Sequence, residues 1–62
     1  MKSVAFLGLS KVGAQNLAES NNLIFRLIRI DDERFMDYPE EHRADRVCIE
    51  IDNFRVSKAS IQ

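Results

Sequence analysis

Apolar residues at helical spacing mark a helix in the first third of the chain. They lie at positions i, i+3 and i+4 and form one narrow stripe: Ala14, Leu17 and Ala18. Ser10 is a good N-cap before this stripe, because its hydroxyl can accept a hydrogen bond from a free N–H group of the first turn. The asparagine pair at 21–22 suits a helix end, since Asn tolerates the left-handed backbone conformation. The sequence therefore predicts a helix of about three turns over residues 10–21.

Three segments after the helix have the composition or the alternation of β-strands. Leu23–Ile30 is rich in β-branched and aromatic residues. Arg46–Asp52 alternates apolar and polar residues, which predicts a half-buried strand with one face in water. The Asp-Asn pair at 52–53 is a turn signal, so Phe54–Ile61 is expected to return as an edge strand. A short extended piece is also expected over Lys2–Phe6.

The stretch Asp31–Ala44 has neither helix nor strand periodicity over about fourteen residues. Loops of this length in compact domains are usually functional or disordered, so it is the first place to look for function. The predicted element order is β-α-β-loop-β-β, and the length allows one small domain, residues 1–62. The expected fold class is α+β, with one helix packed on a small mixed sheet and a long exposed loop between two parallel strands.

Composition places the chain among small globular proteins, with 45% hydrophobic and 31% charged residues. No apolar stretch approaches the roughly 20 residues of a membrane span, and no signal-peptide pattern is visible. Cys48 is the only cysteine, so no internal disulfide can form and a reducing compartment fits best. We therefore expect a cytoplasmic protein without a membrane partner.

The net charge of −1 conceals an acidic middle of the chain. Residues 31–53 hold nine acidic and three basic side chains, a net charge of −6. Because phosphate binding requires a basic face, nucleic acid is not expected as a partner. Most charge runs of this kind are solvated surface.

Residues with catalytic chemistry are sparse. His42 is the only histidine and is expected on the surface, so the serines have no convincing triad partner. The run Gly8–Gly13 lacks the spacing of a phosphate loop. The acids at 31–33 lack the EF-hand pattern, and no Cys/His set could hold zinc. We expect a binding protein with no metal and no cofactor, and not an enzyme.

Two segments of the chain carry a recognisable pattern. The residues RADRVxIxID at 43–52 resemble the strand after the reactive loop in the potato inhibitor I family, the chymotrypsin-inhibitor-2-like proteins and their bacterial relatives. The residues LGLS at 7–10, followed by Ala14, resemble the start of that family's helix. The resemblance covers roughly residues 7–56, most of the chain.

The resemblance implies a serine peptidase inhibitor. In that family an exposed loop, held extended between two parallel strands, enters the peptidase active site like a substrate, and here it would be residues 31–44. Rigidity protects the loop and removes part of the entropic cost of binding. Arginines of the following strand support the loop by pairing with a carboxylate just after the scissile bond. Arg46 matches one of those arginines, and Arg43 is a second candidate support.

The resemblance leaves two positions open for the reactive bond. Met36-Asp37-Tyr38 matches a tripeptide common in the family, and this alignment leaves residues 39–42 as an insertion. Met36 would then enter an apolar pocket of a chymotrypsin- or subtilisin-like peptidase, with Asp37 supported by Arg46 or Arg43. We favour this bond from the sequence.

The other alignment has no gap before Arg43. Counting back from it places the reactive bond between Glu40 and Glu41, preceded by Pro39. A glutamate in this position predicts a glutamate-preferring peptidase as the target.

Departures from the family pattern support an alternative function. The loop is longer than the family's, and Cys48 stands where plant members carry a second supporting arginine. The alternative is a non-inhibitory cytosolic interaction module, which would bind a basic partner through the acidic loop or another chain through the edge strand Phe54–Ile61. An exposed edge would also allow a weak homodimer of an otherwise monomeric protein.

Overall fold

The computed structural model describes all residues, 1–62, and contains two short helical segments and four strands. In chain order these are the 3-10 helix η1 (Ser3–Phe6), the helix α1 (Lys11–Ser20) and the strands β1 (Ile24–Ile30), β2 (Glu33–Arg34), β3 (Arg46–Asp52) and β4 (Arg55–Ile61). No helix is long and apolar enough to cross a membrane.

The helix α1 forms where the sequence predicts it, and its caps are those expected. The Ser10 hydroxyl accepts a hydrogen bond from the Gly13 N–H at 3.0 Å, which satisfies a donor that the first turn leaves free. At the other end Asn22 has a φ of 56°, the left-handed conformation that ends the helix. The predicted helix is thus confirmed to within one residue at each end.

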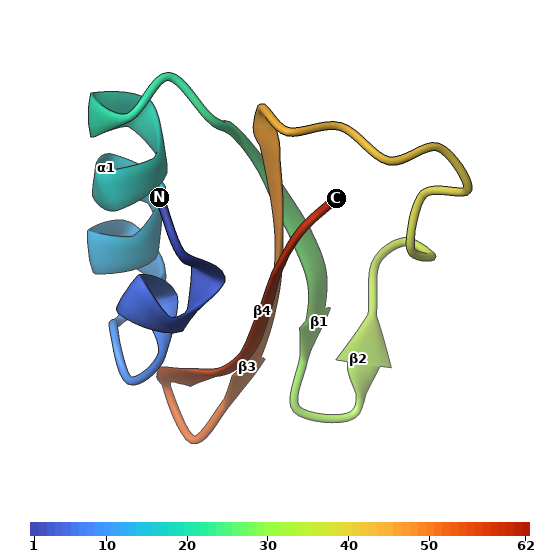
Figure 1. Cartoon of the computed structure of the whole chain (residues 1–62). Helices are drawn as coiled ribbons and strands as arrows, with labels where there is room; N and C mark the ends of the chain where they lie inside the picture. The colour runs from blue at the N-terminus through green and yellow to red at the C-terminus, as the bar shows by residue number, and fades with distance from the viewer.

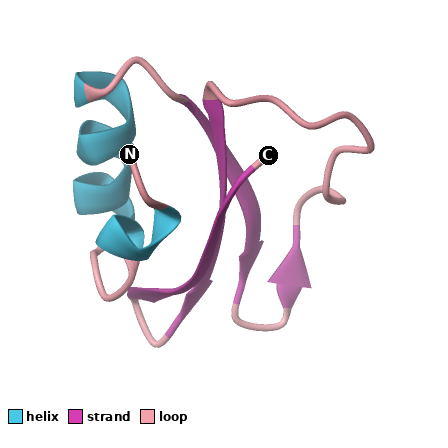
Figure 2. Cartoon of the chain, viewed as in Figure 1, coloured by secondary structure: helices cyan, strands magenta, loops and turns pink.

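The four strands form one mixed sheet in the order β2-β1-β3-β4. β1 and β3 are parallel, whereas β2 pairs with β1 and β4 pairs with β3 in antiparallel fashion. The helix covers one face of the sheet, and the chain between β2 and β3 runs along the other side (Figure 1, Figure 2). The α+β class, the parallel strand pair and the edge position of the last strand are therefore confirmed.

The hydrophobic core lies between the sheet and the helical layer. Its fully or nearly fully buried members come from η1, α1, β3 and β4: Phe6, Ala14, Ala18, Val47, Ile49, Ile51 and Val56. Phe6 is completely buried, so its ring anchors the N-terminal segment to the core. The expectation of an extended piece over Lys2–Phe6 is wrong, because a 3-10 turn is what carries the Phe6 ring into this core.

A bulge in β1 shapes the face that carries the loop. Leu27 pairs with Ile49 and Arg29 pairs with Glu50, so Ile28 is an extra residue in the ladder with β3. The Ile28 carbonyl instead accepts hydrogen bonds from the N–H groups of Phe35 at 2.8 Å and Met36 at 3.4 Å. The predicted loop 31–44 consequently begins with a strand, β2, which continues toward Met36 through these bonds.

The strand β3 is buried on both faces, so the prediction of a face in water is wrong. The interior positions of β3 are all buried, including Cys48 with no exposed surface and Glu50 with 6%. The reason is that the chain after β2 covers the polar side of the strand.

Backbone contacts also cover part of the outer edge of β4. The Val56 N–H donates to the Leu9 carbonyl at 2.8 Å, and the Val56 carbonyl accepts from the Gly8 N–H at 2.9 Å. The edge available for pairing with another chain is therefore restricted to the later part of β4.

Candidate binding loop

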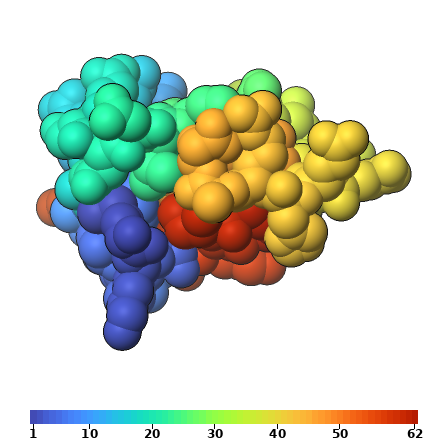
Figure 3. Space-filling model, turned by 45° about the horizontal axis from the view of Figure 1, so that its top comes forward, coloured from blue at the N-terminus to red at the C-terminus, as the bar shows by residue number.

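The segment between β2 and β3, residues 35–45, is called the binding loop below. It leaves the sheet after β2, turns at its far end and returns to the start of β3 (Figure 1). In the space-filling view, the yellow part of the chain around residue 40 projects from the body of the molecule (Figure 3). The loop thus presents its middle to the surroundings while its ends stay on the sheet.

The first residues of the binding loop are held by the backbone of β1. Phe35 and Met36 both donate their N–H groups to the Ile28 carbonyl, so they are not free to pair with another chain. Met36 is 38% exposed and lines a cavity against Ile28. The side chain favoured from the sequence as the reactive one is therefore partly turned toward the sheet.

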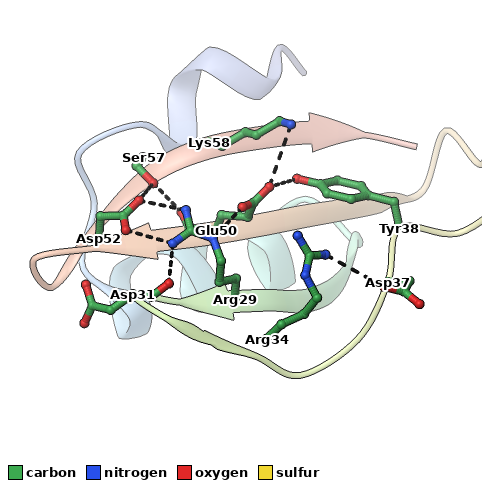
Figure 4. A network of polar contacts seen from close by, with 9 residues as sticks. All are labelled: Arg29, Asp31, Arg34, Asp37, Tyr38, Glu50, Asp52, Ser57 and Lys58. Carbon is green, nitrogen blue, oxygen red and sulfur yellow. Dashed lines mark hydrogen bonds and ion pairs between the residues drawn. The ribbon is translucent and has the colours of Figure 1, made fainter.

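Tyr38 fastens the loop to the middle of β3. Its hydroxyl donates a hydrogen bond to Glu50 Oε2, and its ring lies under the Lys58 ammonium, with Nζ 5.0 Å from the ring centroid (Figure 4). Burial and the adjacent Glu50 carboxylate raise the pKa of Tyr38, so its hydroxyl remains a donor at neutral pH.

Glu50 can serve as the acceptor because a polar network holds it (Figure 4). Arg29 donates from Nε to Glu50 Oε1 at 2.7 Å and from its two Nη atoms to the Asp52 carboxylate at 2.8 and 2.9 Å. Ser57 adds a bond to Asp52 at 2.5 Å. Hydrogen bonds from Tyr38 and Arg29 lower the pKa of Glu50, so the nearly buried carboxylate stays ionised.

Arg46 fastens the far end of the loop. Its Nη2 donates to the Glu41 carbonyl at 2.5 Å and to the Gln62 carbonyl at 2.7 Å. The chain end is in turn held by the Gln62 N–H, which donates to the Arg46 carbonyl at 3.1 Å. The structure therefore places the predicted supporting arginine in contact with the loop, at its backbone.

The other expected support is absent from the structure. Arg43 forms a paired contact with Asp45, with its Nε 2.8 Å from Asp45 Oδ1, and it forms no ion pair with Asp37, Glu40 or Glu41. Asp37 has a 95% exposed side chain whose one ion pair is with Arg34, at 3.9 Å. Neither Arg43 nor Arg46 pairs with Asp37.

Between the two fastened points the loop backbone is open. No backbone–backbone hydrogen bond involves residues 37–42, and Glu40 and Glu41 are exposed. Pro39 restricts the φ angle just before this pair. Of the two candidate reactive bonds, Glu40–Glu41 lies in the open part, whereas Met36–Asp37 begins at a residue whose N–H is bonded to β1.

Sequence reasoning missed the contact between Tyr38 and Glu50 and the ion pairs of Arg29. The available signal was the acidic residue in the middle of an otherwise apolar β3, opposite an arginine in β1. A carboxylate in a buried strand requires a partner. The identity of that partner depends on the bulge at Ile28, which the sequence pattern does not indicate.

The chain was also compared with known proteins. No protein-family model, curated protein or solved structure matches it.

Proposed function

We propose that the protein is a serine peptidase inhibitor that presents the Glu40–Glu41 bond of its binding loop to the peptidase as a substrate-like segment. The observation that carries the proposal is an open backbone over residues 37–42, fastened on one side by the Tyr38–Glu50 bond and on the other by the Arg46–Glu41 bond. A peptidase binds its substrate as an extended backbone through main-chain hydrogen bonds. Residues whose N–H and C=O groups make no backbone bonds within the inhibitor can form such bonds with the peptidase.

The fastening supplies what an inhibitor needs beyond a cleavable sequence. An ordered loop loses little conformational entropy on binding, and this favours tight association. If the bond is cut, Tyr38 and Arg46 hold the two new ends near each other, because they contact the loop on opposite sides of Glu40–Glu41. Religation or slow release then competes with turnover.

This proposal replaces the Met36–Asp37 bond, which the sequence favoured, by the Glu40–Glu41 bond. Met36 would have to turn away from Ile28 and give up its backbone bond to enter a peptidase pocket. Glu40 needs no such change because it is exposed and its N–H is free. We therefore propose a glutamate-preferring serine peptidase as the target.

Substitution of the exposed glutamates separates the two bonds. Glu40→Ala should weaken inhibition of a glutamate-specific serine endopeptidase by at least about tenfold, because a side chain that fills a specificity pocket contributes more than 1.4 kcal/mol. Glu33→Ala is the matched control, since Glu33 is an exposed glutamate of β2 outside the open segment. Unchanged inhibition by the Glu40→Ala variant would contradict the assignment of Glu40–Glu41 as the reactive bond.

A second candidate function rests on unpaired charge. Exposed carboxylates without an ion-pair partner lie in the β1–β2 turn, in β2 and in the binding loop: Asp31, Asp32, Glu33, Glu40 and Glu41. They suit a basic protein partner of a non-inhibitory interaction module, with association that weakens steeply as salt rises. Loss of partner binding on neutralising both Glu40 and Glu41, with no effect on any peptidase, would favour this function.

A further inference from the structure

A small cavity lies between the binding loop and the sheet. It has a volume of about 180 Å³, and it is lined by residues of β1, the loop and the start of β3: Arg26, Ile28, Met36, Asp37, Pro39 and Arg46. This volume corresponds to about six water molecules at liquid density, so it is smaller than typical drug-sized sites. A small organic molecule fits it.

The two arginines of the cavity lack acidic partners. The Arg26 side chain makes no hydrogen bond and no ion pair. Arg46 bonds to carbonyl groups only, through Nη2, and its Nε is buried without an acceptor. Because Arg46 Nε has almost no accessible surface, the donors that a ligand can reach without rearrangement include those of the exposed Arg26 side chain.

The strand register brings these two charges to one side of the sheet. Arg26 pairs with Cys48 and Ile24 pairs with Arg46, so the two arginines are diagonal neighbours on parallel strands. Both act on the Cys48 thiol beneath them: burial raises its pKa, and the charges of Arg46 and Arg26 oppose that rise. Asp37, the one acid at the cavity, is almost fully exposed and pairs with Arg34.

We propose that Arg26 and Arg46 bind a small organic carboxylate in this cavity, with the apolar part of the ligand against Ile28 and Met36. A guanidinium group matches the planar carboxylate with parallel hydrogen bonds, and the exposed Arg26 guanidinium has no other partner in the fold. The apolar lining favours a carboxylate with a short hydrocarbon part over inorganic phosphate. The proposal stands apart from peptidase inhibition, since it uses the inner side of the loop.

Nuclear magnetic resonance titration of the full chain tests the proposal with benzoate, acetate and inorganic phosphate at constant ionic strength. We expect saturable shifts confined to the Arg26 Nε–H signal and to amides of residues around the cavity, with benzoate tighter than acetate. Shifts that do not saturate, or that spread evenly over the charged surface, would overturn it. Phosphate binding as tightly as benzoate would overturn the carboxylate class.

An arginine substitution provides the matched comparison. Arg26→Gln should weaken benzoate binding by at least about tenfold, the loss of roughly one charge-assisted hydrogen bond. Arg26 is exposed and unpartnered, so this variant should fold. Arg55→Gln changes an equally exposed arginine of β4 away from the cavity and should leave binding unaltered. Equal binding by the Arg26→Gln variant would refute the site.

Met36→Ala provides a test that leaves both charges in place. Removal of the apolar wall should weaken benzoate more than acetate, because only benzoate carries a large apolar part. Equal effects on the two ligands would contradict the proposed orientation of the ligand.

Discussion

Phe54 occupies a backbone conformation that suits glycine better. It has a φ of 67°, follows Asn53 with a φ of 52° at the tip of the β3–β4 hairpin, and is 88% exposed. Two-residue hairpin turns of this kind favour Asn-Gly, because both residues take positive φ. The left-handed conformation costs a residue with a side chain about 1–2 kcal/mol, and the exposed ring recovers little of that cost.

Phe54→Gly should therefore stabilise the protein. We expect the free energy of unfolding to rise by about 1 kcal/mol, since relief of backbone strain exceeds the entropy that glycine adds to the unfolded chain. Urea unfolding measures it, and Phe54→Ala, which removes the ring but keeps the Cβ, should change stability little. A destabilised glycine variant would show that the Phe54 ring makes stabilising contacts.

Acidic pH should weaken the fold through the network at Arg29. Hydrogen bonds from Arg29 and Ser57 lower the pKa of Asp52 to about 2 from 3.8, and the pKa of Glu50 is also lowered. Because the folded carboxylates bind protons less readily than the unfolded ones, their contribution is present above the unfolded pKa values and is lost as pH falls through the folded ones. The free energy of unfolding should fall between about pH 4.5 and pH 2.

Asp52→Asn provides the matched variant for this titration. It should flatten the acid limb of the stability curve, because the substituted residue no longer takes up a proton on unfolding. An acid limb of the same steepness in the variant would assign the pH dependence to other groups.

At the scale of elements, sequence pattern determined most of the architecture. The stripe at Ala14, Leu17 and Ala18 located the helix, and its cap residues located both ends. Alternation in residues 46–52 correctly predicted β3, but it wrongly predicted that one face of the strand lies in water. Alternation reports which side chains share a face, whereas the cover over the polar face comes from a loop whose path depends on the bulge at Ile28.

The sequence predicted only part of the candidate site, because local pattern does not report contacts between different elements. The resemblance placed Arg46 beside the loop, and its contact with the Glu41 backbone agrees with a supporting role. The supporting pair expected at Asp37 was wrong, because Asp37 points into solvent near Arg34. The Tyr38–Glu50 contact joins residues from different elements, and local pattern contains no information about such a pair.

Tyr38→Phe tests how much this contact orders the loop. The variant keeps the ring under Lys58 and removes only the hydroxyl donor to Glu50. We expect a loss of about 1 kcal/mol of stability, since the bond goes to a charged acceptor but is only partly buried. The amides around the loop tip should exchange faster with solvent.

Alkaline pH gives this prediction an independent readout. Because the pKa of Tyr38 is raised above its ordinary value of 10.0, its contribution is complete below pH 10 and is lost as pH rises toward the folded pKa. The native chain should lose stability above pH 10 more steeply than the Tyr38→Phe variant. Identical alkaline limbs would mean that the hydroxyl does not stabilise the loop.

At the scale of the whole molecule, one small sheet is covered on both faces, by the helical layer on one side and by the binding loop on the other. A chain of this size buries only about 60% of its unfolded surface, so the fold has little core to spare. The helical layer packs on the apolar face, and the binding loop covers the polar face, where Tyr38 bonds to Glu50 and the Glu41 carbonyl bonds to Arg46. Order in the loop and stability of the sheet are consequently coupled.

That coupling explains how an irregular segment can stay ordered in a protein without disulfides. Cys48 is the only cysteine, and it is buried beneath the loop side of the sheet. Charged hydrogen bonds and a buried strand therefore carry the role that a covalent bridge has in many small proteins. The proposed inhibition depends on this order.

The measurement that tests the central proposal most directly is mass spectrometry of the chain during titration against a glutamate-specific serine endopeptidase. We expect stoichiometric inhibition with at most one slow cut, between Glu40 and Glu41, and both fragments held together under native conditions. Rapid cleavage at several positions of residues 35–45, or no inhibition of the enzyme, would contradict a peptidase inhibitor.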